Sequence, residues 1–408
     1  MYLSYDGMTD PLGRSQVLPY LARLARLGHE ITIVSFEKQP RSGALDHVRA
    51  ICSDAGLRWH PQTYTKHPPV VSTMRDVRRM RAVAEHLHGE HRFEVVHCRS
   101  DLPALVGLRL KRRHRLRFLF DMRGFWADER VDGGLWNLRN PLYRAIYKYF
   151  KRQERAFLAE ADAVVSLTHA SSGPLSGMAP GVRIDVIPCC ADLELFTPAT
   201  CEERRTARQQ LGIGEQVRVP VYLGSIGTWY MLGEMLDAFA VQRCRSPGAI
   251  MLWVTPDAPN VIRAEAARRG LPPESLIIRS AAREEVRVLL AAADYGLFFI
   301  RPVHSKIASS PVKLGELLAM GMPVLTNQGI GDVDRILEES GAGVTVDGFD
   351  PPAYARALDF LEALRPDPAR AAGTVRRWFD LEDGVRRYDD LYRRLSPDSR
   401  DSARQDTR

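Results

Sequence analysis

The chain has 408 residues, of which 45% are hydrophobic and 26% are charged, and these proportions are ordinary for a soluble globular protein of two or slightly more domains. Its net charge of +7 is uneven, because residues 1–190 hold 29 Lys and Arg against 19 Asp and Glu, whereas the rest hold 28 against 31. No run of about 18 apolar residues occurs, and no basic segment leads into an apolar one near Met1, so we expect neither a membrane-spanning helix nor a signal peptide.

Strand-like and helix-like patterns alternate along the first half. Residues 2–5 are predicted to form a short strand, 6–14 a glycine-bearing loop and 15–27 a helix, because apolar residues recur there at helical spacing. Gly28 is expected to end that helix before a strand at 30–35. Further strands are predicted at 95–98, 118–121, 163–167 and 183–187.

The second half repeats this organisation. Residues 192–216 are polar and interrupted by Gly and Pro, which predicts the crossing between halves and a small helix. Six strands are then predicted, at 219–223, 250–254, 276–278, 295–300, 323–326 and 343–346. An amphipathic helix is predicted at 375–395.

This alternation predicts an α/β protein with two doubly wound, Rossmann-like domains, at 1–190 and 191–380, and a ligand crevice at the carboxyl ends of their strands. Residues 381–395 are expected to form a C-terminal helix that packs back towards the first domain. Residues 396–408 have no apolar content and are expected to be disordered.

The Cys and His residues indicate a reducing compartment and no metal. The six cysteines form neither a CxxC pair nor a zinc spacing, and the eleven histidines show no ligand spacing. We therefore expect a cytoplasmic protein without a metal or other cofactor.

Basic residues cluster at 75–81, 111–117 and 143–155. Such clusters can attract anionic lipid headgroups or other phosphates, which predicts a peripheral contact with the inner face of a membrane. The alternative is that they are solvated helix faces and loop edges.

The most informative segment is 309–327, SSPVKLGELLAMGMPVLTN, which is predicted to form a loop, a helix from Val312 to about Met320, and a buried strand. The N-terminus of a helix can hold a phosphate through its unpaired N–H groups. Lys313 lies in this first turn, where the dipole disfavours a cation, so an anionic ligand is indicated. Glu316, one turn later, could accept hydrogen bonds from two ribose hydroxyls, or it could be a surface partner of Lys313.

Five segments in order resemble the family 4, GT-B glycosyltransferases. PVKLGELLAMGMPVLTN resembles the donor-binding motif of that family, and the opening YLSYDGMTDPLGRSQ, ADAVVSLTHAS with IDVIPCCADLELFTP, VYLGSIGTWYMLGEMLDAFA and AADYGLFFI resemble other parts of it. The resemblance implies two Rossmann-like domains that face each other across a cleft, with the donor bound by the second.

By this resemblance Glu316 matches the second glutamate of the E-x7-E motif, which holds the ribose. The first glutamate would fall at Ala308, so it is absent here, and Ser309 and Ser310 are predicted to reach the donor hydroxyls instead. The family also places an Arg and a Lys after the first donor-domain strand, and residues 225–234 hold neither. The donor-binding prediction is completed by Ser225, Gly227, Thr228 and Ser280, with Lys313 as the main cation on the diphosphate.

In the first half, Gly13 is predicted to let backbone N–H groups approach the reacting region, the alternative being an ordinary turn glycine, and Arg14 and Gln16 flank it. The loop 120–134 follows a strand and is rich in polar residues, so it predicts an acceptor site. Arg123 and Asp128 are the catalytic candidates there, beside Asp121 and Glu129. The alternative for this loop is a structural ion-pair network.

Asp332 and Asp334 spell DxD, a metal–sugar motif of a different glycosyltransferase fold. Here they start a predicted helix, so an N-cap aspartate explains them better than a metal site.

The predicted reaction transfers a sugar from a nucleotide-diphosphate sugar to an acceptor hydroxyl, and the resemblance implies retention at the anomeric carbon. Lys313, Glu316, Arg123 and Asp128 are the predicted catalytic residues, no metal takes part, and UDP is favoured over GDP. We expect a lipid-linked, saccharide or small-molecule acceptor in the assembly of envelope polysaccharide or glycolipid, and no nucleic acid. The alternatives are a sugar-nucleotide epimerase or phosphorylase of similar fold, and a non-catalytic protein that binds nucleotide-sugar or acts as a scaffold.

Overall fold

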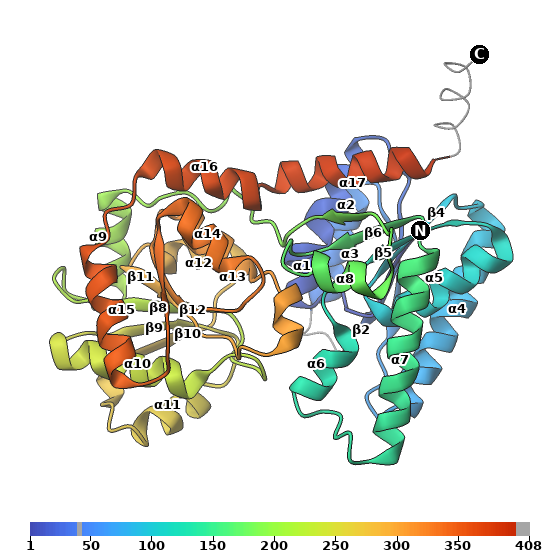
Figure 1. The fold of residues 1–408 in the computed structure, drawn as a ribbon. Helices are drawn as coiled ribbons and strands as arrows, with labels where there is room; N and C mark the ends of the chain where they lie inside the picture. Colours follow the sequence, from blue (N-terminus) through green and yellow to red (C-terminus); the bar gives the residue numbers. More distant parts are fainter. Residues whose placement is uncertain (39–42, 397–408) are drawn as a thin grey trace. The chain divides into compact units, whose positions relative to one another are not determined.

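The computed structural model describes residues 1–38 and 43–396. The chain divides into two compact units: unit 1 is Met1–Pro188 with the chain from Glu382 onward, and unit 2 is Cys189–Leu381 (Figure 1). The division at 188/189 lies two residues before the predicted boundary. The tail predicted to be disordered, 396–408, lies outside the described residues except for Ser396.

Unit 1 is built on a parallel sheet whose strand order is β3-β2-β1-β4-β5-β6-β7 in the described residues. The strands are β1 (Tyr2–Ser4), β2 (Thr32–Glu37), β3 (Arg58–Thr63), β4 (Val95–Arg99), β5 (Arg117–Asp121), β6 (Ala163–Ser166) and β7 (Ile184–Val186). The helices are α1 (Pro11–Gln16), α2 (Leu18–Arg26), α3 (Ala44–Asp54), α4 (Val71–His91), α5 (Asp101–His114), α6 (Trp126–Asp132), α7 (Pro141–Glu160), α8 (Ser172–Met178) and α17 (Leu381–Leu395).

Helices cover both faces of this sheet. Successive side chains of a strand point to opposite faces, so one strand contacts both layers of helices. On β4, Cys98 packs against Gly107 of α5, whereas His97 lies against Tyr388 and Tyr392 of α17. The middle of β5 is apolar, since Phe118, Leu119 and Phe120 are all buried between the two layers.

The C-terminal helix α17 is part of unit 1. Tyr388 packs edge-on against Tyr20 of α2, and Asp389 lies 2.6 Å from Nε2 of His29. Arg387 donates a hydrogen bond to the carbonyl of Val186 in β7 at 2.9 Å.

Unit 2 has a parallel sheet of strand order β10-β9-β8-β11-β12-β13 in the described chain. Its strands are β8 (Pro220–Leu223), β9 (Met251–Val254), β10 (Leu276–Arg279), β11 (Tyr295–Leu297), β12 (Val324–Asn327) and β13 (Gly343–Val346). Its helices are α9 (Cys201–Gln210), α10 (Leu232–Arg245), α11 (Pro259–Ala267), α12 (Arg283–Leu290), α13 (Val312–Ala319), α14 (Val333–Ser340), α15 (Pro351–Ala363) and α16 (Pro368–Phe379), with short 3-10 helices η1 (Pro273–Ser275) and η2 (His304–Ala308).

Two predicted helices are each broken in two. The predicted helix 15–27 is divided at Val17, because Pro19 lacks an N–H and its ring disfavours a helix through the preceding turn. The predicted helix 375–395 is divided at Asp380, which is extended and forms a parallel bridge with Ala191. Its amphipathic pattern continues across the break, so the pattern alone predicted one helix.

Two further predictions about the secondary structure were wrong, and one strand was missed. Strand β3, RWHPQT, was not predicted because this edge strand is only partly buried and lacks an apolar alternation. The predicted strand 295–300 ends at Leu297, and Ile300 forms only an isolated bridge with Tyr230. The predicted loop 6–14 ends at Asp10, where α1 begins.

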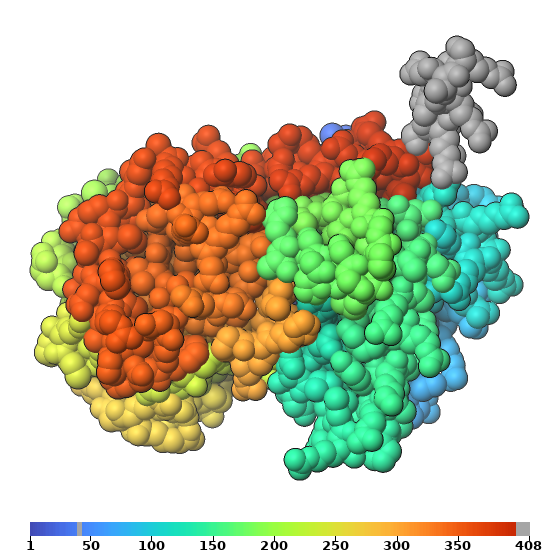
Figure 2. Space-filling view, in the orientation of Figure 1, coloured from blue at the N-terminus to red at the C-terminus, as the bar shows by residue number. Residues whose placement is uncertain are grey.

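Among the described helices, none combines the length and apolarity that crossing a bilayer would require. Helix α7 exposes Arg144, Lys148 and Arg152 of the predicted basic cluster. Its surface is seen as teal and green atoms in Figure 2.

We expect Gly107→Ala to destabilise unit 1 by about 1–3 kcal/mol, because a Cβ there would overlap Cys98 Sγ and lie 2.9 Å from the Phe118 ring. Gly89→Ala in the exposed part of α4 is the matched control, since a Cβ there meets no atom within 4 Å. The control should stabilise by about 0.5–1 kcal/mol through helix propensity. Urea unfolding would measure both, and equal midpoints would contradict the packing shown for Gly107.

Candidate functional site

In doubly wound sheets, ligands bind outside the carboxyl ends of the strands, where the strand order reverses. In unit 2 this reversal lies between β8 and β11. The segments that leave these two strands meet there, since Met231 donates a backbone hydrogen bond to Phe299 and Arg301 donates one to Trp229.

Lys313, in the first turn of α13, places its ammonium at this edge of unit 2. Nζ lies 3.5 Å from the centre of the Tyr230 ring and 4.0 Å from that of the Tyr222 ring. It is buried and has no hydrogen-bond partner among the described residues. Burial lowers the pKa of Lys313 well below its usual range, although Glu316 and the ring faces favour the charged form. A buried cation with unused donors is costly, so this position suits an anionic ligand.

Glu316 is paired with a residue that the sequence did not predict. Its Oε1 accepts a hydrogen bond from Arg283 Nη1 at 3.0 Å, and the Arg283 guanidinium stacks over the Phe196 ring at 5.3 Å. Burial raises the pKa of Glu316, and Arg283 opposes this rise. The pair presents a carboxylate acceptor beside guanidinium donors, an arrangement that can hold vicinal hydroxyls.

The loop after β8 is anchored by Asp257. Its Oδ2 accepts hydrogen bonds from Ser225 Oγ at 2.8 Å and from the Ile226 amide at 2.5 Å. The hydroxyl predicted to bind the donor is therefore engaged with Asp257 in this structure. Gly227 and Thr228 follow as exposed loop residues, and their role stays a prediction.

The remaining predicted donor residues differ in their surroundings. Ser310 Oγ accepts a hydrogen bond from the Cys189 amide at 3.2 Å, whereas Ser309 is partly exposed just before α13, which begins at Val312. Ser280 is exposed directly after β10. Ala308, at the place of the missing first glutamate, is buried in η2.

In unit 1 the strand order reverses between β1 and β4, and charged residues gather at the ends of β1, β4 and β5. Asp121 Oδ1 lies 3.4 Å from Arg123 Nη1, and its Oδ2 lies 3.3 Å from Nε2 of His97, whose Nδ1 lies 2.8 Å from the Tyr392 hydroxyl. Burial raises the pKa of Asp121, but Arg123 and His97 outweigh burial and hold it well below its usual range. Arg99, which was not predicted, lies 3.4 Å from Asp6 at the same edge.

Gly13 lies in helix α1 and not in a loop, so the alternative of a turn glycine is wrong. A Cβ at this position would overlap the carbonyl oxygen of Gly7, which shows that the helix packs directly on that backbone. The segment below is held by Glu37, whose carboxylate accepts hydrogen bonds from the Met8 and Thr9 amides, both at 2.9 Å.

Arg14 is exposed and Gln16 is buried. Glu37 was not predicted, because it is the last residue of β2 and lies far along the chain from Met8 and Thr9, which it binds.

Asp128 lies in an ion-paired cluster of its own. Its two carboxylate oxygens accept hydrogen bonds from the Tyr147 hydroxyl at 2.7 Å and from Lys151 Nζ at 2.8 Å. Lys151 is also paired with the buried Glu154. This is the structural network that was the alternative for the loop, and a catalytic role of Asp128 stays a prediction. Asp332 occupies the N-cap position of α14, and Asp334 accepts a hydrogen bond from the Gly329 amide at 3.0 Å.

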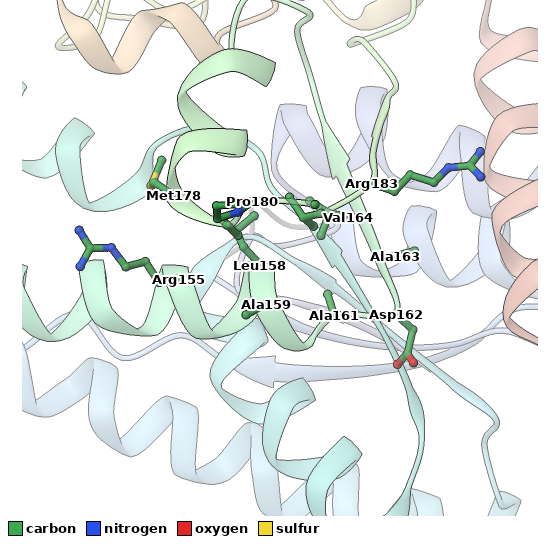
Figure 3. A pocket seen from close by; sticks show the side chains of 13 residues that line it. Arg155, Leu158, Ala159, Ala161, Asp162, Ala163, Val164, Met178, Pro180 and Arg183 are labelled. Carbon is green, nitrogen blue, oxygen red and sulfur yellow. The ribbon is translucent and has the colours of Figure 1, made fainter.

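A hollow of about 570 Å³ in unit 1 lies at the other end of the strands (Figure 3). Its lining includes the apolar side chains of Leu158, Val164 and Met178, and Arg155 and Arg183 lie on opposite sides. Because Ala163 begins β6 and Arg183 precedes β7, the hollow is at the amino ends of these strands and is not the expected place for a ligand.

Comparison with known proteins shows what this chain is similar to. Residues 14–190 match the glycosyl transferase 4-like domain. Similar proteins include the D-inositol 3-phosphate glycosyltransferases of Salinispora arenicola, 27% identical over 223 residues that cover 51% of this chain and 48% of that protein, and of Geodermatophilus obscurus, 26% identical over 298 residues that cover 70% and 62%. The alignment with the first of these spans about half of that relative's length.

Solved structures with a similar fold span nearly the whole chain. They include sucrose-phosphate synthase of Thermosynechococcus elongatus, with a TM-score of 0.74 and 17% identity over 97% of this chain and 98% of that one. WaaG, a glycosyltransferase involved in lipopolysaccharide biosynthesis, has a TM-score of 0.69 and 18% identity over 96% and 98%. Anabaena HepE in complex with UDP-glucose has a TM-score of 0.67 and 14% identity over 96% and 98%. The chain thus has the GT-B fold, with a glycosyl transferase 4-like domain at residues 14–190.

We expect Lys313→Met to stabilise unit 2 by about 1–2 kcal/mol at neutral pH, because an apolar side chain would replace a buried cation without hydrogen bonds. Urea unfolding of the wild type and the variant would measure this difference. A variant less stable than the wild type would show that the contacts of the ammonium with Tyr222 and Tyr230 outweigh its desolvation.

The difference in stability between the wild type and Lys313→Met should also depend on pH. The pKa of Lys313 is lowered in the folded chain, while the unfolded side chain titrates near its usual value of about 10.4. Between these two pKa values the unfolded state binds the extra proton, so the wild type gains stability as pH rises. The advantage of Lys313→Met should therefore shrink between pH 7 and about pH 10, and a constant difference would mean an unshifted pKa.

Proposed function

We propose that this chain, which carries a glycosyl transferase 4-like domain, is a glycosyltransferase that moves a sugar from a nucleotide-diphosphate sugar to an acceptor hydroxyl. The observation that carries the proposal is the buried Lys313 ammonium, with unused donors, at the N-terminus of α13 and one turn from Glu316. Unit 2 would bind the donor, with Glu316 and Arg283 on the ribose. Unit 1 would bind the acceptor.

In the reaction the bond between the anomeric carbon and the diphosphate oxygen breaks, and the acceptor oxygen bonds to that carbon. Negative charge develops on the departing diphosphate, and Lys313 with the first amides of α13 would stabilise it. The acceptor proton would pass to an oxygen of the leaving phosphate, so the proposal needs no enzymic base. We propose that the anomeric configuration is retained and that no metal takes part.

A UDP-sugar is the proposed donor, with a GDP-sugar as the second choice. The support is the similar fold of HepE, which was solved with UDP-glucose. A nucleoside without the diphosphate should bind far more weakly, since Lys313 would then have no anion to meet.

The proposed acceptor is lipid-linked, a saccharide or a small molecule, in the assembly of envelope polysaccharide or glycolipid. The net positive charge of residues 1–190 and the exposed cations of α7 would suit anionic acceptors and a peripheral contact with the inner face of a membrane. A cytoplasmic location belongs to the same proposal.

The alternative is a protein that binds nucleotide-sugar without turnover, or a scaffold. The missing first glutamate, at Ala308, favours it, and the presence of both Lys313 and Glu316 argues against it.

Calorimetric titration of UDP, GDP and ADP into the wild type and into Glu316→Ala, with EDTA present, would test the donor site. We expect one diphosphate to bind the wild type and to lose about 1–3 kcal/mol of binding free energy in the variant, because ribose hydroxyl contacts are removed. Glu338→Ala, at an exposed position of α14 in the same unit, is the matched control and should bind as the wild type does.

If no diphosphate binds, or if Glu316→Ala binds as well as the wild type, unit 2 does not hold the donor there. If the protein binds a UDP-sugar but releases no UDP with any acceptor that is offered, the result would favour the non-catalytic binding protein. Binding that appears only when EDTA is replaced by a divalent metal ion would contradict metal independence.

A further inference from the structure

Two arginines that the donor chemistry does not use lie at the carboxyl edge of the unit 1 sheet. Arg99 is the last residue of β4, beside the reversal of strand order between β1 and β4, and Arg123 follows β5 by two residues. Arg99 pairs in register with Asp121, to which Arg123 is bound. Both arginines therefore lie at the place where a doubly wound sheet takes its ligand.

These charges are shielded from water to different degrees. The Arg99 side chain is 5% exposed and that of Arg123 is 13% exposed, whereas Asp6, which bonds Arg99, is 47% exposed. The bond from Arg99 Nε to Asp6 is long, at 3.4 Å. A buried guanidinium whose own carboxylate partner lies half in solvent and at a long distance can exchange that partner for a ligand anion at small cost.

The arginines and the carboxylates beside them balance, because Arg99 and Arg123 carry two positive charges and Asp6 and Asp121 carry two negative ones, so an anionic ligand would take the place of Asp6 on Arg99. His97 is buried, and burial lowers its pKa, so it is neutral near pH 7. Burial raises the pKa of Tyr2 to about 12 and that of Tyr388 well above its usual value, so both hydroxyls stay protonated. Asp121 is buried, its carboxylate is bound by Arg123, and its charge also interacts with that of Arg99.

The shape of the group selects the ligand. A guanidinium is a planar fork of N–H donors that matches the oxygens of a phosphate or carboxylate, and two forks at one place suit the three oxygens of a phosphomonoester. Asp6, partly exposed beside them, can accept a hydrogen bond from a hydroxyl next to the phosphate.

We propose that Arg99 and Arg123 form a phosphate subsite in unit 1 that recognises a phosphorylated acceptor, with Asp6 receiving a neighbouring hydroxyl. This inference deepens the proposed function and rests on it only for the statement that the bound phosphate belongs to the acceptor. The phosphate can be that of a small soluble compound or of a lipid headgroup, since both offer the same monoester chemistry.

Calorimetry with inorganic phosphate and with glycerol phosphate would test the subsite, without any glycosyl transfer. We expect Arg99→Lys and Arg123→Gln each to weaken binding about 10-fold or more, because a fork with charge-assisted hydrogen bonds is lost. Arg139→Gln, an exposed position of the same unit, is the matched control, and Lys313→Met reports on phosphate that binds in unit 2 instead. Circular dichroism would show whether each variant is folded. If Arg99→Lys does not fold because Arg99 is more deeply buried, Arg123→Gln still tests the proposal.

Vesicles that contain phosphatidic acid would distinguish the lipid source, with phosphatidylcholine vesicles as the control. Sedimentation with phosphatidic acid that Arg123→Gln abolishes would assign the subsite to a headgroup, and loss of binding to the soluble phosphates alone would assign it to a soluble acceptor. The proposal is overturned if no phosphate binds, if Arg139→Gln weakens binding as much as Arg123→Gln, or if only Lys313→Met removes it. UDP binding to Arg123→Gln should be unchanged, because UDP binds in unit 2. Failure of the phosphate subsite can therefore be distinguished from failure of the proposed function.

Discussion

The reversal of strand order beside β1 and β8 is the constraint on which both candidate sites depend. Because parallel strands are joined by crossovers of one hand, the connections on the two sides of such a point run in opposite directions, and the carboxyl edge there stays open. Lys313 lies at this edge in unit 2, and Arg99 lies at it in unit 1. Residues far apart in the chain thereby become neighbours through topology alone.

The two edges hold positive charge in different ways. In unit 2, the ammonium of Lys313 is a point charge that packs against aromatic ring faces. The carboxylate of Asp257 accepts hydrogen bonds from the loop after β8. In unit 1, Arg99 and Arg123 are planar cations, and their carboxylate partners are Asp6 and Asp121. A compact ammonium suits a diphosphate that departs during the reaction, and fixed forks suit a group that must be held still.

The fold class could be predicted because buried strands such as VLTN in β12 and MLWV in β9 are apolar runs between helical patterns. Lys313 and Glu316 could be singled out as candidates because they lie within one recognisable segment, and both are buried in α13. Their partners could not: Arg283 is 33 residues from Glu316, and Arg99 is 93 residues from Asp6, so only the folded chain brings them together. The polar strand β3 and the helix break at Asp380 also left no apolar signal in the sequence.

The membership of α17 in unit 1 has a consequence for biosynthesis. Unit 2 is inserted between Pro188 and Glu382, so it is an uninterrupted stretch of chain, whereas unit 1 is made of two stretches. On a ribosome, the whole of unit 2 is synthesised before α17 has been completed. His97 and Tyr20 must wait for Tyr392 and Tyr388, so the first half synthesised is the last to complete its core.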